Sequence, residues 1–319
     1  MSLQPAVRVP APTLAGLYGR DQRRPLYSRL PALYFLTPPW LKRAARVAFA
    51  VRQGRTDALI ERYLGALESV PDGDGRPVPL LLTHDVDTAA GLATLPRLLT
   101  VEESHGLASL TFVVTHRYAW RRTDLARLAE RGHAFGVHDT SHDNRLAYLP
   151  AAKIEARLAR AQQALGSLDS GAFRAPAFLR SASLYEGIAR RVRVDFSTND
   201  VALLWPHPGD GLGSPFPVRH RRLTVVPTTL PRDGEMVALG LDRAAVLDLC
   251  RRKAQQLARV GAPAVLLTHP DPTFTDTDRR IDAYGELLGW LRSSGLFHLA
   301  TPTETLVELE RRTIGELAA

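Results

Sequence analysis

The sequence predicts an α/β fold in which strands and helices alternate along most of the chain. Short apolar runs bounded by turn residues recur between residues 79 and 299, as is typical of buried strands. The segments between these runs carry apolar residues at helical spacing, for example Ile154, Leu158 and Leu165. Strands that alternate with helices favour parallel pairing, and therefore a doubly wound sheet or a (β/α) barrel.

The order of the expected elements follows from these runs. Strands are expected at residues 79–84, 109–115, 133–137, 172–175, 192–197, 223–227, 264–268 and 296–299. Helices are expected at residues 41–52, 57–69, 123–131, 154–165, 242–260 and 277–294. Both candidate folds place their active sites at the carboxyl ends of the strands. Polar side chains at those ends are therefore the candidates for function.

The N-terminal part of the chain differs from the rest. Residues 1–40 are rich in Pro and Arg without a steady period, and residues 71–75 form a Gly-rich and Asp-rich loop. We therefore expect residues 1–75 to form an extension, an irregular segment plus two helices, and residues 76–319 to form the barrel. The basic first helix is expected to pack on its own domain, the alternative being contact with a membrane surface.

Composition restricts the kind of partner. The chain has 319 residues, of which 45% are hydrophobic and 23% charged, as in soluble globular proteins. Its net charge of +8 permits anionic partners, but no nucleic-acid-binding motif accompanies it and no nucleic-acid partner is expected. The single cysteine, Cys250, excludes an internal disulfide. No secretory signal pattern is present at the N-terminus, so a cytoplasmic location is expected.

The run from Leu80 to Asp87 is apolar and ends in two carboxylates. Asp85 and Asp87 are two residues apart on a predicted strand, so they share one face and lie about 6.6–6.8 Å apart along it. A buried carboxylate is costly unless it is paired or bound to a metal. The alternative is that both acids are ordinary turn residues.

A second polar cluster follows the expected strand at 133–137. His138 and His142 are four residues apart, and in a helical turn both rings could bind one metal at about 2.0–2.1 Å. The alternative is two surface histidines in a polar loop. With one of the two aspartates they would supply the three protein ligands of a catalytic zinc site, and the other aspartate could accept a proton from water. With both aspartates they would form a closed structural site.

Three further strand ends carry polar residues. Arg174 could brace a carboxylate, and the backbone N–H groups after Pro176 could face an oxyanion. Asp195 ends the expected strand at 192–197. His269 follows the strand at 264–268, and the ordinary histidine pKa of about 6.5 suits a general acid. The respective alternatives are a surface salt bridge, a loop cap and a hydrogen-bonded rim histidine.

Taken together, these motifs resemble the polysaccharide deacetylases of the NodB-homology type, carbohydrate esterase family 4, over about residues 78–302. Residues 83–87 match the first motif in its Asp-x-Asp form, which implies that Asp85 is the general base and Asp87 a metal ligand. His138 and His142 match the family's His-x-x-x-His ligand pair.

The later motifs follow in the family's order. Arg174 and Pro176 match the Arg-x-Pro motif, which implies that the arginine holds the base and that a nearby backbone amide, at Ala177, binds the oxyanion. Asp195 resembles the acid of the fourth motif, which orients the catalytic histidine, although Asp200 competes for this role.

The resemblance also implies a fold, a cofactor and a reaction. The fold is a distorted (β/α)7 barrel, His269 is the general acid, and the cofactor is a divalent metal, with Zn2+ expected. The predicted reaction removes an acetyl or similar small acyl group from an N-acylated amino sugar or a glycosylated compound. Asp139 stands where the family usually has Ser or Thr, which affects how the loop with the histidine ligands is held. Ala177 stands where the family usually has an aromatic residue, which affects the wall that faces the substrate.

Two other function classes stay open at this point. Asp-x-Asp at a strand end also holds a metal and a nucleotide sugar in glycosyltransferases, which is an analogy at the level of the fold. A non-catalytic carbohydrate-binding barrel is the other alternative. Measurements of metal content and of amide hydrolysis would distinguish the deacetylase from the glycosyltransferase and from the binding barrel.

Overall fold

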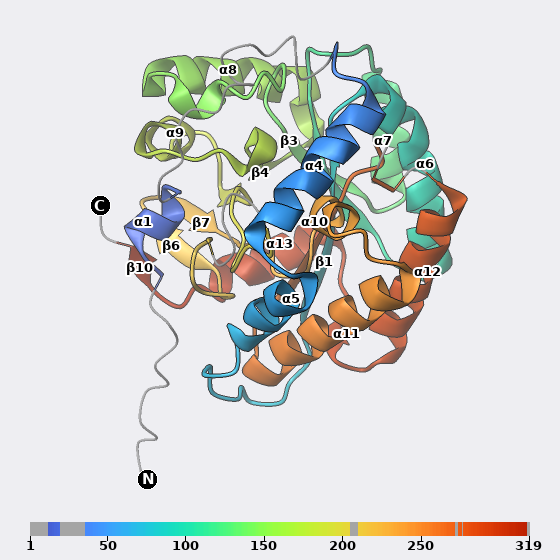
Figure 1. Ribbon diagram of the computed structural model, residues 1–319. Helices are drawn as coiled ribbons and strands as arrows, with labels where there is room; N and C mark the ends of the chain where they lie inside the picture. Colours follow the sequence, from blue (N-terminus) through green and yellow to red (C-terminus); the bar gives the residue numbers. More distant parts are fainter. Residues whose placement is uncertain (1–11, 20–35, 205–209, 272–273, 276, 318–319) are drawn as a thin grey trace.

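The computed structural model describes residues 12–19, 36–204, 210–271, 274–275 and 277–317. In Figure 1 the helices are arranged around the strands at the centre of the molecule. The strands are β1 (Val78–Val86), β2 (Ser109–Val113), β3 (Ala134–Val137), β4 (Asp169–Phe173), β5 (Val194–Asp195), β6 (Val218–His220), β7 (Leu223–Val225), β8 (Ala264–Thr268), β9 (Phe297–His298) and β10 (Glu316–Leu317).

The helices follow the strands in chain order. The α-helices are α1 (Leu14–Leu17), α4 (Pro39–Gln53), α5 (Thr56–Gly65), α6 (Ala89–Ser104), α7 (Arg122–Glu130), α8 (Ala151–Leu165), α9 (Ala182–Ile188), α10 (Asp233–Ala238), α11 (Arg243–Val260), α12 (Asp278–Ser293) and α13 (Pro302–Arg311). Three 3-10 turns accompany them, η1 (Leu146–Tyr148), η2 (Gly166–Leu168) and η3 (Pro176–Phe178).

The sheet has a parallel centre, as the alternation of elements predicts. The strand order is β10-β6-β7-β5-β4-β3-β2-β1-β8, and β9 pairs with the start of β1. Every pair from β8 through β1 to β7 is parallel, whereas β6 is antiparallel to β7. The expected mixed α/β fold of the (β/α)7 type is therefore confirmed, with its strand carboxyl ends at one edge of the sheet.

The strand ladder is not closed into a complete barrel in the described part of the chain. Instead, the segment after β7 connects the two sides of the sheet. The backbone N–H groups of Thr229 and Leu230 both donate to the carbonyl of Val265 in β8, at 3.2 and 3.0 Å. Thr228 forms a parallel bridge with Asn199. These contacts bring β8 and its polar end next to the elements that follow β5 and β7.

The core forms on both sides of β1, all of whose residues are buried. In α5, which matches the helix expected at residues 57–69, Leu59, Tyr63 and Leu64 are buried against the same cluster as β1 and β8. The Tyr63 hydroxyl donates to the carbonyl of Thr229 at 2.9 Å. The division of the chain at residue 75 stays a prediction. No helix in the described ranges combines the length and apolar character required to cross a membrane.

Candidate active site

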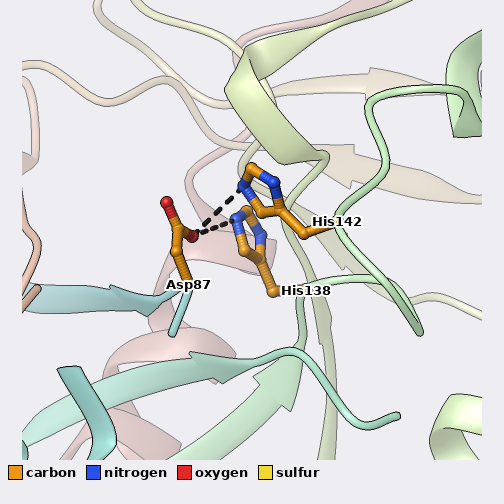
Figure 2. A group of neighbouring side chains, drawn as sticks. All are labelled: Asp87, His138 and His142. Carbon is orange, nitrogen blue, oxygen red and sulfur yellow. Dashed lines mark ion pairs between the residues drawn. The ribbon is translucent and has the colours of Figure 1, made fainter. Parts of the chain in front are cut away.

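Three side chains from the ends of β1 and β3, the strands on either side of β2, converge at the carboxyl edge of the sheet (Figure 2). Asp87 follows β1, and His138 and His142 follow β3. Asp87 Oδ1 lies 3.3 Å from His138 Nε2 and 3.2 Å from His142 Nε2. Their potential ligand atoms lie within 4.8 Å of one another.

This cluster fits a divalent metal ion. Ligands at about 2.0–2.1 Å in a tetrahedron lie roughly 3.3 Å apart, close to the spacing of Asp87 Oδ1 from each imidazole. Asp87 Oδ1 is buried, and its polar neighbours among the described residues are the two imidazole Nε2 atoms, so a metal ion among these three atoms would give the buried carboxylate oxygen its partner. His138 Nδ1 faces the carbonyl of Arg174 at 2.8 Å, a contact that places the proton on Nδ1 and leaves the Nε2 lone pair for a metal.

The loop that carries the two histidines is not the helical turn that their spacing suggested. It is irregular, and Asp139, His142 and Asn144 have positive φ angles of 67°, 50° and 58°. Residues with side chains rarely adopt this region, and such strain concentrates at functional sites. The loop rather than a helix face therefore turns both imidazoles towards Asp87.

Arg157 of α8 holds this loop in place. Its guanidinium contacts Asp139 Oδ1 at 3.0 Å, Ser141 Oγ at 2.6 Å and Asp143 Oδ2 at 3.1 Å. Burial raises the pKa of Asp139, and Arg157 opposes that shift. The unusual acid at position 139 thus has a structural reason, because it pairs with an arginine supplied by the next helix.

Asp85 is held beside the cluster rather than inside it. Arg174 Nη1 lies 2.8 Å from Asp85 Oδ1, and Arg174 Nη2 donates to Thr83 Oγ1 at 3.0 Å. Burial acts to raise the pKa of Asp85, but Arg174, with help from His138 and His269, outweighs it and the pKa lies below the ordinary value. Asp85 is therefore an ionised carboxylate whose second oxygen faces His138 Nε2 at 3.7 Å.

His269 lies near the same oxygen of Asp85 as His138 does. Its Nε2 lies 3.9 Å from Asp85 Oδ2. On the other side of the ring, Nδ1 contacts Asp233 Oδ1 at 2.8 Å, and the backbone N–H of His269 donates to Asp233 Oδ2 at 2.5 Å. Burial acts to lower the pKa of His269, but Asp233, followed by Asp87 and Asp85, outweighs it and raises the pKa to about 9.

Asp233 was not among the sequence candidates. The predicted role of orienting His269 was given to Asp195, with Asp200 as the competitor, whereas the contact to His269 is made by Asp233 of α10. Asp195 instead accepts hydrogen bonds from Tyr185 and Ser197, and burial raises its pKa to about 6. Asp200 pairs with the buried Lys253 at 2.8 Å. A catalytic role for Asp195 therefore stays a prediction.

Asp271 is a second acid at the site that sequence analysis did not single out. It accepts a hydrogen bond from the Asp87 backbone at 2.9 Å and one from the Thr88 hydroxyl. Burial, with the neighbouring Asp87, raises its pKa to about 6. Gly91 permits this approach, because a Cβ at that position would lie 2.5 Å from the Asp271 carboxylate.

The predicted oxyanion segment forms the tight turn η3. Ala177 and Phe178 both have positive φ, at 52° and 54°, and the Ala175 N–H before the turn donates to Ser197 Oγ at 2.8 Å. Pro176 is buried and Ala177 is exposed. The Arg174 guanidinium lies 5.7 Å from the ring of Phe178 in this turn and 4.4 Å from the Phe112 ring.

Comparison with known proteins agrees with the resemblance seen in the motifs. Residues 73–184 match the family model described as Polysaccharide deacetylase. This range includes the three metal-ligand candidates, Asp85 and the Arg-x-Pro segment, and it ends before Asp195, Asp233 and His269. No curated protein sequence matches the chain.

Solved structures share the fold at low sequence identity. A Pseudomonas aeruginosa PAO1 protein described as a probable polysaccharide deacetylase has a TM-score of 0.57 at 11% identity, covering 74% of this chain and 92% of its own. A Mycobacterium smegmatis protein assigned as a polysaccharide deacetylase has a TM-score of 0.54 at 16% identity, covering 77% and 97%. Puue allantoinase has a TM-score of 0.53 at 11% identity, covering 75% and 90%. These likenesses concern the fold.

Proposed function

This chain carries a polysaccharide deacetylase region of the NodB-homology type, and from that premise we propose that it is a metal-dependent hydrolase of N-acyl amino sugars. The removed group is an acetyl or a similarly small acyl group, and the bond that breaks is the amide C–N bond. The proposal rests most on one observation, that Asp85 and His269 face each other beside the Asp87, His138 and His142 cluster.

Asp87, His138 and His142 would hold the metal, and Zn2+ suits their nitrogen and oxygen donors. A divalent ion bound there would polarise the acyl carbonyl and make water more acidic. The remaining chemistry falls to the side chains around it. Pro176 and Ala177 are proposed to form the wall that faces the developing oxyanion, with the Ala177 N–H as donor.

Asp85 and His269 divide the proton transfers between them. Arg174 keeps Asp85 ionised, so its Oδ2 can take a proton from the attacking water. Asp233 keeps His269 protonated, so its Nε2 can give a proton to the leaving nitrogen. Two neighbouring groups whose environments shift their pKa values in opposite directions are the pattern expected of a base and an acid. Arg174 and Asp233 act as positioning residues.

The proposal is tested by metal content and acyl release together. The purified chain should contain a divalent metal, release acetate from N-acetylglucosamine oligomers or from a monomeric N-acetylated sugar, and lose this activity on chelation until Zn2+ is restored. His138→Ala should lose both the metal and the activity. Tight binding of a nucleotide sugar without hydrolysis would favour the glycosyltransferase reading. Full metal content without hydrolysis of any amide or ester would favour the binding protein.

A further inference from the structure

Helix α4 carries an apolar stripe that the rest of the protein leaves exposed. Trp40, Val47 and Val51 are 69%, 38% and 73% exposed, and their spacing of seven and four residues places them on one side of the helix. Leu41 and Leu36 are also exposed, at 44% and 77%. Outside residues 36–51, the described part of the chain has a single other exposed large hydrophobic side chain, Ile314.

The opposite side of α4 is fixed to the rim of the candidate active site. Ala50 is buried, and the Arg46 guanidinium lies 4.4 Å from the ring of Phe274. Phe274 in turn stacks on His269, with ring centroids 4.6 Å apart. Figure 1 shows α4 crossing the front of the molecule next to α10, the helix that supplies Asp233, and the two helices are in contact. The exposed stripe therefore points outward from the rim.

The charged residues of the sequence segment that contains this stripe have one sign. Residues 22–56 contain no Asp or Glu, and their basic residues are Arg23, Arg24, Arg29, Lys42, Arg43, Arg46, Arg52 and Arg55. A helix with an apolar stripe, a tryptophan and basic flanks is the pattern that binds to the interface of a membrane with anionic lipids. Each cation near such a surface adds to the attraction.

We propose that α4 is an interfacial helix that docks the rim of the active site on an anionic lipid surface. Trp40, Val47 and Val51 enter the boundary between headgroups and acyl chains, and Arg52 and Arg55 remain among the headgroups. A second copy of the chain fits this surface poorly, because a two-fold contact would place the same basic segments against each other. A nucleic acid fits poorly as well, because the stripe is mainly aliphatic and offers one aromatic ring for stacking.

The test is cosedimentation of the full chain with vesicles. One set contains phosphatidylcholine alone, and the other contains phosphatidylcholine mixed with phosphatidylglycerol. The apolar variant is Trp40→Ser with Val51→Ser, and its matched control is Ile314→Ser. The charge variant is Arg52→Glu, and its matched control is Arg222→Glu, which changes an exposed arginine on the turn between β6 and β7. Thermal melts and metal content check that every variant is folded.

The proposal predicts binding to the anionic vesicles that weakens at high salt, because salt screens surface charges. The apolar variant should bind at least about tenfold more weakly, since it removes two apolar side chains from the interface. The charge variant should lose about fivefold or more. Both controls should bind as the unmodified chain does.

Three results would overturn the proposal. The first is no binding to anionic vesicles at low salt. The second is weaker binding of the charge variant together with unchanged binding of the apolar variant, which would indicate general attraction to polyanions. The third is a dimer of the unmodified chain, measured by light scattering, that dissociates in the apolar variant, which would make the stripe a contact between two copies.

Discussion

Replacing Asp233 by Asn tests the acid role of His269 with a change of a single charge. The substitution removes the negative charge 2.8 Å from His269 Nδ1 and keeps the shape of the side chain. The carboxylate is the largest influence that raises the His269 pKa from 6.5 to about 9. At pH 8 a histidine with a pKa of about 9 is roughly 90% protonated, and one with a pKa of about 6.5 is roughly 3% protonated. Turnover at pH 8 should therefore fall by up to about 30-fold, the limit reached if Asp233 accounts for the whole rise in the pKa.

The assay is the pH dependence of acyl release from pH 6 to pH 10. In Asp233→Asn the alkaline limb should move to lower pH, by up to about 2.5 units, while activity near pH 6 changes least. Asp195→Asn is the matched control, since Asp195 contacts Tyr185 and Ser197 rather than His269. An alkaline limb that moves in Asp195→Asn and stays in place in Asp233→Asn would refute the assignment.

The contact between Asp233 and His269 should also make the stability of the fold depend on pH. Because the folded chain raises the pKa of His269, the Asp233 contact stabilises the fold fully below pH 6.5 and loses this effect as the pH rises through about 9. Asp233→Asn should therefore lower the melting temperature more at pH 6 than at pH 10.

Further predictions concern the loop that carries the two histidines, the close approach of Gly91 to Asp271, and the buried thiol of Cys250. Arg157→Gln should weaken metal binding about 10–100-fold in a competition titration, whereas Arg160→Gln, on the exposed side of the same helix, should not. Gly91→Ala should lower the free energy of unfolding by about 1–3 kcal/mol in denaturant titrations, because its Cβ would meet the Asp271 carboxylate. Cys250 is buried and burial raises its pKa to about 12, so it should react with a thiol reagent only after unfolding.

The sequence predicted the parts of the site that are local in the chain. The apolar run before Asp85 and Asp87 identified β1, and the ends of β3 and β8 identified His138 and His269. These predictions succeed because a strand and the polar residues at its end are read from adjacent positions. Strands β6 and β10 have three and two residues, too few to show a period.

The missed contacts are those between distant segments. Asp233 lies 36 residues before His269, and nothing in the residues around it distinguishes it from any acid at a helix start. Asp195 is the last residue of β5, and the metal-ligand candidate Asp87 likewise comes at the end of a strand. The Asp195 side chain nevertheless contacts Tyr185 and not the candidate site. The outward orientation of the α4 stripe likewise depends on where α10 and Phe274 lie, and the sequence alone favoured packing of this helix on its own domain.

The most direct test of the proposed site is a pair of variants, Asp85→Asn and Asp87→Asn, compared for metal content and turnover. Asp85→Asn should keep the metal content of the unmodified chain and lose about 10²–10⁴-fold in turnover, because a general base contributes that much. Asp87→Asn should lose the metal, because it removes the carboxylate to which both imidazoles point. Melting curves confirm folding, since Asp85→Asn leaves Arg174 without its buried partner. If Asp85→Asn loses the metal and Asp87→Asn retains it, or if Asp85→Asn stays active, the division of roles between the two aspartates is wrong.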